Sequence, residues 1–292
     1  MIEFGVVTHG GVGTDDGLSD GCRAACEAAF RMLEGGKGAI DAVVEACIKL
    51  EDDGRFNAGS GSALRIDGET VEMDAAVMDS EGTVGVVINI RNVKNPVAVA
   101  RALTASPHVA LAGRGAEAFA RKIGAEQFPG VSEKAVEGFQ KTLRLLKEGR
   151  IAEINPRWKD ADKLFSDKIS SDTIGAAALD RRGTFAVAAS TGGASPMMVG
   201  RVGDTPMIGC GFYAGPAGAF AATGIGEEII KRMLAKTAYD FVDGGEDVVS
   251  AGRRGIGLFE REIPAGLIGI SRKGFAVSAN RSMAHHAMVR EG

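Results

Sequence analysis

SSDTIGAAALDRRGTFAVAASTGG, residues 170–193, contains two short apolar runs separated by a charged turn. Asp180 at the first turn position and Gly183 at the fourth are typical of a type I turn, so the runs predict an antiparallel hairpin. The same pattern recurs as AAVMDSEGTVGVVI at 75–88 and as GLIGISRKGFAVSA at 266–279. Three hairpins are therefore expected, with MIEFGVVTH at the start of the chain as a further strand.

Helical patterns separate these hairpins. Apolar or small residues recur at helical spacing in the stretches 17–34, 38–50, 96–105, 114–123, 226–242 and 245–260. The strands are apolar without polar alternation, which is typical of sheets covered on both faces. These features predict an α+β protein with antiparallel sheets inside and helices outside.

Residues 133–172 differ from the rest of the chain. They begin with a polar amphipathic helix, VEGFQKTLRLLKEGRI, and continue as NPRWKDADKLFSDKISSD, which is highly charged and poor in apolar residues. This composition predicts an exposed linker. Because it ends directly before Thr173, the segment is either an ordinary linker between domains or a processing segment.

The composition narrows the class of protein. The chain has 292 residues, 45% of them hydrophobic and 25% charged, which is typical of a globular protein with a sizeable core. The net charge of -4, with the acids scattered, argues against nucleic-acid binding. We find no apolar run of membrane-spanning length and no signal peptide, so we expect no membrane association. The four cysteines form no C-x-x-C pair, which predicts no metal site and a reduced, cytoplasmic protein.

Thr173 lies at the junction between the charged segment and the strand that follows. A threonine hydroxyl is a weak nucleophile and needs a base beside it. If the chain is cut before Thr173, the freed α-amine, with a pKa of about 7.7–8 in model peptides, can serve as that base. Position alone is weak support, since most threonines at strand starts only favour the strand conformation.

Three further motifs carry polar groups suited to an amino-acid substrate. STGG places Thr191 at the end of the partner strand. Arg201 and Asp204, three residues apart, could hold a carboxylate and an ammonium, or could simply form a surface ion pair. TGIGEE places Thr223, Gly224 and Gly226 at a helix entry, where backbone N–H groups suit an oxyanion or merely begin the helix.

Six motifs together resemble one family. NAGSGSAL, EMDAAVMD, DTIGAAALD, STGG, GRVGDTPMIGCG and TGIGEE occur in this order in the plant-type asparaginases, which are related to isoaspartyl peptidases and glycosylasparaginases. The resemblance runs from HGG to about Ala279. It implies a four-layer αββα sandwich of the N-terminal-nucleophile hydrolase type. It also implies a single domain, 1–292, that cuts itself into 1–172 and 173–292, and a homodimer of these αβ units.

The resemblance also assigns roles to individual residues. Thr173 matches the nucleophile, exposed by self-cleavage of the Asp172–Thr173 bond, and Thr191 matches the threonine that tunes it. Arg201 and Asp204 match the pair that holds the substrate's α-carboxylate and α-ammonium.

Further matches concern the oxyanion and the loops around the nucleophile. Thr223 and Gly224 match the oxyanion hole, Gly226 lies in the same substrate loop, and Asn57 matches an asparagine near the nucleophile. No cofactor is implied, although residues 50–60 align with a loop whose carbonyls bind a structural sodium ion in some members. The implied reaction is hydrolysis of the side-chain amide of L-asparagine, of the isopeptide bond of β-aspartyl peptides, or of both.

Some residues differ from the plant-type pattern. Asp172 stands where plant-type asparaginases usually have glycine, and Ser171 stands where glycosylasparaginases have histidine. STGG matches the asparaginase branch, since the other branch tends to have STNG. Two alternatives therefore stay open: a glycosylasparaginase-like amidase acting on N4-substituted asparagine, and an uncleaved, inactive homologue that binds aspartate. We expect His285 and His286 to be solvated tail residues.

Overall fold

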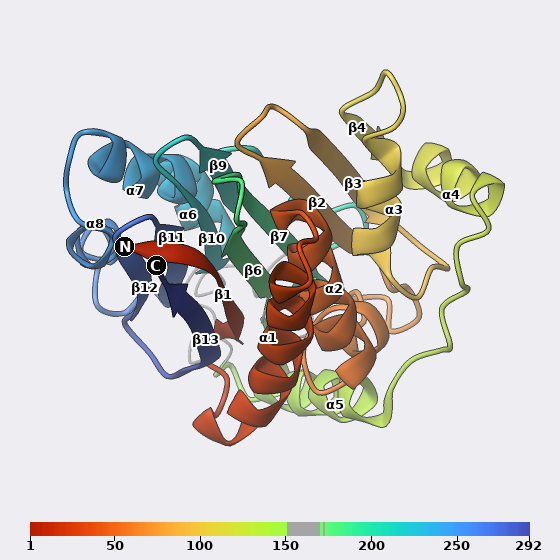
Figure 1. Ribbon diagram of the computed structural model, residues 1–292. Helices are drawn as coiled ribbons and strands as arrows, with labels where there is room; N and C mark the ends of the chain where they lie inside the picture. The colour runs from red at the N-terminus through yellow and green to blue at the C-terminus, as the bar shows by residue number, and fades with distance from the viewer. Residues whose placement is uncertain (151–169, 172) are drawn as a thin grey trace.

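Two β-sheets form the centre of the molecule in the computed structural model, which describes residues 1–150, 170–171 and 173–292 (Figure 1). The larger sheet has the strand order β13-β1-β6-β7-β2-β3-β4, and the smaller has β12-β11-β10-β9. The strands of the larger sheet are β1 (Ile2–Val12), β2 (Met73–Asp79), β3 (Val84–Ile90), β4 (Ala110–Ala112), β6 (Ile174–Leu179), β7 (Phe185–Thr191) and β13 (Met283–Glu291). The smaller sheet contains β9 (Phe212–Gly215), β10 (Gly218–Gly224), β11 (Ala265–Ser271) and β12 (Gly274–Ala279).

The three predicted hairpins are confirmed as β2–β3, β6–β7 and β11–β12, all antiparallel. In the β6–β7 turn, Gly183 donates its N–H to Asp180 O at 3.0 Å and has a φ of +86°. The Asp180 carboxylate accepts from the N–H groups of Arg182 and Thr184 at 2.9 and 3.0 Å. It also accepts from the N–H of Ala39 at 3.1 Å, which ties this turn to the first residue of a helix. Every residue of β6 and β7 is buried, as expected for strands covered on both faces.

The chain end is a strand, so the expectation that His285 and His286 lie in a tail was wrong, although His285 is exposed as expected. Both residues belong to β13, which pairs with β1 and places them opposite His9 and Thr8. His285 is exposed and His286 is partly buried. The unpaired edge of β1 supplies the hydrogen-bonding partners that order this segment, and such a tertiary contact leaves no local pattern.

Helices cover the outer face of each sheet. The helices are α1 (Ser19–Glu34), α2 (Ala39–Asp53), α3 (Pro96–Leu103), α4 (Gly113–Lys122), α5 (Glu133–Lys147), α6 (Gly226–Arg232), α7 (Leu234–Asp243) and α8 (Val248–Ile256), with short 3-10 turns η1 (Asp16–Leu18) and η2 (Gly59–Gly61). One apolar cluster joins α1 to α4 with the larger sheet, and another joins α7 and α8 with the smaller one. A third contains residues of both sheets, including Val187 and Ile268, so the sheets pack against each other.

The predicted helix over 226–242 is interrupted. It divides into α6 and α7 at Met233, whose φ of 45° is left-handed. The first N–H groups of α7 bond to a neighbouring loop: Ala235 donates to Cys210 O at 3.1 Å and Lys236 to Gly209 O at 2.8 Å. Docking on this loop reorients the helix, and the periodicity of the segment cannot reveal it.

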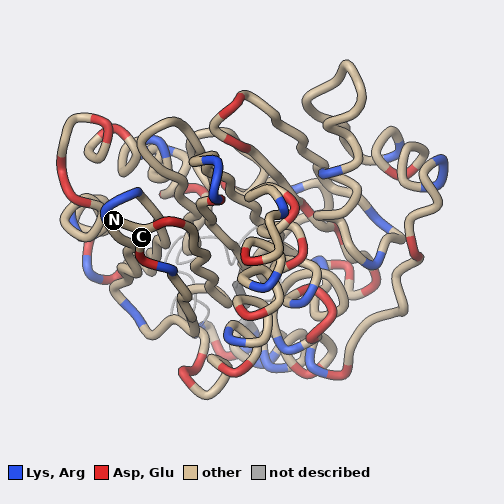
Figure 2. The backbone as a smooth tube through the Cα atoms, in the orientation of Figure 1, with Lys and Arg blue, Asp and Glu red and all other residues tan. Residues whose placement is uncertain are grey.

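The amphipathic helix at the start of the charged segment is confirmed as α5. Ser170 and Ser171 form β5, which pairs with β8 (Ala194–Ser195). Residues 151–169 and Asp172, which complete the expected linker and the cleavage site, lie outside the described residues. Basic and acidic residues are interspersed along the described chain, consistent with the scattered charge of the sequence (Figure 2).

Candidate functional site

Thr173 lies at the start of β6, beside the end of its partner strand. Its hydroxyl is 3.2 Å from the hydroxyl of Thr191, and both residues are buried, with 6% and 2% of their surface exposed. The pairing of Ile174 with Ser190 in the β6–β7 hairpin fixes this proximity. Two hydroxyls in contact and shielded from bulk water form a hydrogen bond that orients them, but neither is a base, so activation of either as a nucleophile requires a further group.

Asn57 holds the turn that follows Thr191. Its side-chain amide donates to Gly193 O at 2.6 Å, and its backbone carbonyl accepts from the N–H of Gly192 at 2.8 Å. Its side-chain oxygen accepts from the N–H of Ala63 at 2.8 Å. The structure thus brings Asn57 and Thr191 together through the two glycines of STGG.

Arg201 and Asp204 flank Gly226. A β-carbon on Gly226 would lie 2.9 Å from both Arg201 Nη2 and Asp204 Oδ1, so the glycine leaves room for the two side chains. The surface ion pair considered for Arg201 and Asp204 is not what forms: Asp204 is buried, and Arg201 Nε donates instead to Glu227 at 3.0 Å.

The Asp204 carboxylate is not fully satisfied. Its Oδ2 has no hydrogen-bond partner among the described residues. Burial raises the pKa of Asp204 to about 7, while nearby Arg201 opposes the shift. A buried carboxylate with an empty acceptor is suited to receive a cationic group, because it lacks the hydrogen bonds that water would otherwise supply.

Thr223 and Gly224 end β10, where α6 begins. The Thr223 hydroxyl accepts from the N–H of Val12 at 3.2 Å, which ties β10 to the end of β1. Gly224 has a φ of +141°, and a β-carbon there would collide with Pro264 O. This position therefore requires glycine.

A family model described as asparaginase matches residues 6–292. The chain belongs to this asparaginase family. A plant-type L-asparaginase from Pyrococcus abyssi is 38% identical to it over 301 residues, covering 98% of this chain and 96% of the relative. An isoaspartyl peptidase/L-asparaginase from Rattus norvegicus is 39% identical over 284 residues, covering 94% of this chain and 82% of the relative. The corresponding protein of Macaca fascicularis is 40% identical over 280 residues, covering 92% and 87%.

His9 is a side chain at this asparaginase-family site that the sequence analysis did not single out. It is fully buried, and its Nδ1 accepts from the N–H of Gly11 at 3.1 Å, which places the proton of the neutral ring on Nε2. Burial lowers its pKa to about 3, and the Thr173 backbone beside the ring partly opposes this shift. Gly175 leaves room for the imidazole, since a β-carbon there would lie 2.5 Å from Nε2. The HGG motif, which lies within β1, was the available signal.

A cavity of about 630 Å³ lies next to Asn57. Its lining combines the loop after Asn57 with α5 and Ser195: Asn57, Gly61, Ala63, Leu64, Lys134, Ala135, Glu137, Gly138, Phe139, Gln140, Lys141, Arg144 and Ser195. The first part of the charged segment is therefore folded against the loop that holds the STGG turn.

No helix among the described residues is long and apolar enough to span a membrane.

Proposed function

We propose that this chain is an amide hydrolase that cleaves its own Asp172–Thr173 bond and then uses Thr173 as an N-terminal nucleophile. The proposed substrates are L-asparagine and β-aspartyl peptides. The observation that carries the proposal is the buried contact of 3.2 Å between the hydroxyls of Thr173 and Thr191. The relatives named L-asparaginase and isoaspartyl peptidase support the choice of substrate.

The proposed self-cleavage uses the Thr173 hydroxyl. This oxygen attacks the Asp172 carbonyl, the peptide C–N bond breaks as the ester forms, and the nitrogen takes up a proton to become the α-amine. Water then hydrolyses the ester and restores the hydroxyl. Thr173 is thereby left as the first residue of the fragment 173–292.

In the proposed turnover the freed amine accepts the proton of the Thr173 hydroxyl, which attacks the side-chain amide carbonyl. Thr223 and Gly224 stabilise the oxyanion. Arg201 binds the substrate's α-carboxylate and Asp204 its α-ammonium, which fits the unsatisfied Oδ2 of Asp204. Ammonia or a peptide amine leaves with the proton, an aspartyl ester remains, and water hydrolyses it to aspartate and free Thr173.

The surroundings of Gly192 favour an asparaginase over a glycosylasparaginase-like amidase. A β-carbon on Gly192 would lie 2.5 Å from both Asn57 Oδ1 and Ser62 Cα. An asparagine at this position, as in the STNG motif, therefore has no room here.

The proposed architecture is the four-layer αββα sandwich of the N-terminal-nucleophile hydrolases, forming a single domain that assembles as a homodimer of αβ units in the cytoplasm. It is supported by the apolar clusters that join helices to each sheet and the two sheets to each other. Light scattering of the cleaved protein tests the dimer: a mass of one αβ unit contradicts it.

A structural sodium ion in the 50–60 loop fits the residues present. The carbonyl oxygens of Gly54 and Phe56 lie 2.5 and 2.0 Å from where a β-carbon on Gly61 would be, so the two oxygens are near one another. Oxygen ligands of this kind suit hard cations. The ion would stabilise the loop that carries Asn57, with no part in the chemistry. A melting temperature that is higher in sodium chloride than in potassium chloride of equal ionic strength would support it.

Intact-mass measurement of the purified protein, with Thr173→Ala as the control, tests the proposed function. The wild type is expected as two fragments, the second beginning at Thr173, and the variant as one chain. A single uncleaved chain with full activity on asparagine would contradict the mechanism. Activity on N4-substituted asparagine alone would indicate the glycosylasparaginase-like alternative, and aspartate binding without turnover would indicate the inactive homologue.

A further inference from the structure

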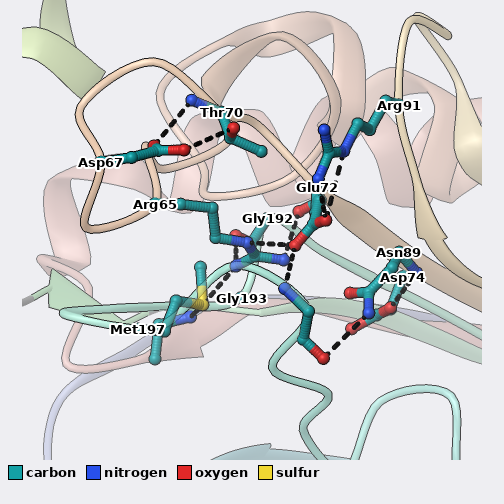
Figure 3. Close-up of polar contacts among 12 residues, drawn as sticks. Arg65, Asp67, Thr70, Glu72, Asp74, Asn89, Arg91, Gly192, Gly193 and Met197 are labelled. Atoms are coloured by element: carbon teal, nitrogen blue, oxygen red, sulfur yellow. Dashed lines mark hydrogen bonds and ion pairs between the residues drawn. The ribbon is translucent and has the colours of Figure 1, made fainter. Parts of the chain in front are cut away.

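A buried ion pair lies beside the site and has no part in the proposed chemistry. Arg65 is fully buried, and its Nε donates to Glu72 Oε2 at 3.0 Å while its Nη2 donates to Glu72 O at 2.9 Å (Figure 3). Glu72 is only 3% exposed. Burying two charges costs so much solvation that such a pair adds little net stability over well-packed apolar residues. The function of such a pair therefore lies in the groups that it binds.

The Arg65–Glu72 pair forms hydrogen bonds with both ends of the segment 192–200. Arg65 Nη1 donates to Gly192 O at 3.3 Å, and the N–H of Gly200 donates to Glu72 Oε2 at 2.7 Å. Gly192 directly follows Thr191, and Gly200 directly precedes Arg201. Arg65 and Glu72, which contact each other, thus link the backbone next to Thr191 to the backbone next to Arg201.

Gly200 is held through its carbonyl as well. Asn89 Nδ2 donates to Gly200 O at 3.0 Å, and the N–H of Asn89 donates to the buried carboxylate of Asp74 at 2.8 Å (Figure 3). Both polar groups of the Gly200 backbone are therefore bonded to side chains of the 72–89 region. The backbone that leads into Arg201 has little freedom to shift.

We infer that Arg65, Glu72 and Asn89 are positioning residues that fix Arg201 at the distance from Thr173 and Thr191 that an aspartyl substrate requires. The inference rests on the proposed function, in which Arg201 binds the α-carboxylate. A displaced Arg201 weakens binding of the substrate, while the hydroxyl pair that performs the chemistry stays in place. The expected signature is a raised KM with a nearly unchanged kcat.

The main test is the double variant Arg65→Met/Glu72→Met. Apolar side chains of similar length replace the pair, but Gly192 O, the N–H of Gly200 and Arg91 lose their bonds to it, so we expect a lower melting temperature. We expect two fragments and a KM for asparagine that is about tenfold higher with a similar kcat. The calorimetric Kd of aspartate is expected to rise by the same factor.

Asn89→Gly provides a second, milder variant. Asn89 has a φ of 47°, which glycine adopts freely, so the change removes the hydrogen bond to Gly200 O and keeps the backbone conformation. Loss of one such bond predicts a KM raised by about two- to tenfold. The matched control is Arg101→Met/Asp41→Asn, which removes the half-exposed Arg101–Asp41 pair and is expected to leave KM unchanged.

Wild-type KM values in both the double variant and Asn89→Gly would overturn the inference, and a fall in kcat at unchanged KM would do so equally. If the double variant does not fold, Asn89→Gly decides the question alone. Failure of the proposed function gives a different result, because the wild-type chain itself would then neither cleave nor turn over asparagine.

Discussion

The hydroxyl of Thr191 lies 3.2 Å from the hydroxyl of Thr173 and accepts a hydrogen bond from the N–H of Gly193 at 2.9 Å. In this arrangement the Thr173 hydroxyl donates to Thr191, and the Thr191 hydroxyl is directed to Gly193 O at 3.5 Å. If Thr173 is deprotonated, as the proposed mechanism requires, its oxygen can only accept, so this hydrogen bond must reverse and the Thr191 hydroxyl would then stabilise the negative charge.

Removal of the Thr191 hydroxyl is expected to slow the chemistry. Thr191→Val keeps the shape of the side chain and should lower kcat by about 10- to 100-fold, since hydrogen bonds to charged groups contribute about 1.5–3 kcal/mol. Thr191→Ser should retain most of the activity. The measurement is steady-state turnover of asparagine, normalised to the fraction of cleaved chain. Thr184→Val, at the other end of the same hairpin, is the control, and equal losses in both valine variants would contradict the assignment.

Substrate binding is expected to weaken in acid because of Asp204. Its pKa of about 7 means that the carboxylate is neutralised as the pH falls through 7, and a neutral group no longer attracts an ammonium. The Kd of aspartate, measured calorimetrically, should rise about tenfold for each unit below pH 7. A Kd that is constant between pH 5 and 8 would rule out this role.

Asp204→Asn serves as the control for this pH dependence. It should bind aspartate weakly at every pH, and it should be more stable than the wild type above pH 7. The folded-state pKa of about 7 lies above the ordinary aspartate value of 3.8, so the loss of stability from the ionised group is complete above pH 7. This penalty fades as the pH falls from 7 towards 4. The thermal stability of the two proteins should therefore converge in acid.

The hairpins were predictable because their signals are local. Asp180 and Gly183 meet the demands of their turn within four residues, and the apolar runs on either side need only pair with each other. β13 and the break at Met233 were not predictable from local patterns. β13 is ordered by pairing with β1, at the opposite end of the chain, and α7 is set by the loop at Gly209.

The candidate site likewise contains residues that the sequence predicted and residues that it did not. Thr173, Thr191 and Asn57 belong to motifs that the sequence displays, and the structure brings them together. Glu227, the ion-pair partner of Arg201, lies in TGIGEE but had no predicted role, and Arg65 lies just after NAGSGSAL. Their roles come from burial and from contacts between segments that lie far apart in the chain, such as Arg65 with Gly192.

Gly192 is expected to tolerate no side chain. A β-carbon there would lie 2.5 Å from Asn57 Oδ1 and from Ser62 Cα, so Gly192→Ala must displace Asn57 or the backbone that follows it. We expect slower self-cleavage and a melting temperature several degrees lower, measured by mass spectrometry and calorimetry. Gly115→Ala, in the helix α4, is the control, because nothing lies within 4 Å of its β-carbon position. Normal cleavage in Gly192→Ala would show that the turn can adjust.

Glu51 is expected to be protonated at neutral pH and to limit stability in alkali. It is fully buried, its Oε1 accepts from Ser190 Oγ at 2.6 Å and from the N–H of Val97 at 3.1 Å, and Oε2 has no hydrogen-bond partner among the described residues. Burial outweighs these hydrogen bonds and raises its pKa to about 8. Since the ordinary pKa of glutamate is 4.5, the native state retains a proton that the unfolded chain loses, and this contribution to stability disappears as the pH rises from 4.5 to 8.

Glu51→Gln should remove that pH dependence. The amide is the same size as the protonated acid, its oxygen can accept the same two hydrogen bonds, and it cannot ionise. We expect a melting temperature above that of the wild type at pH 9 and close to it or lower at pH 5, measured by calorimetry across this range. Glu45→Gln, which removes a partly exposed pair with Lys49 on the same helix, should leave the pH dependence unchanged. Parallel curves for Glu51→Gln and the wild type would mean that Glu51 ionises normally, and that water reaches it.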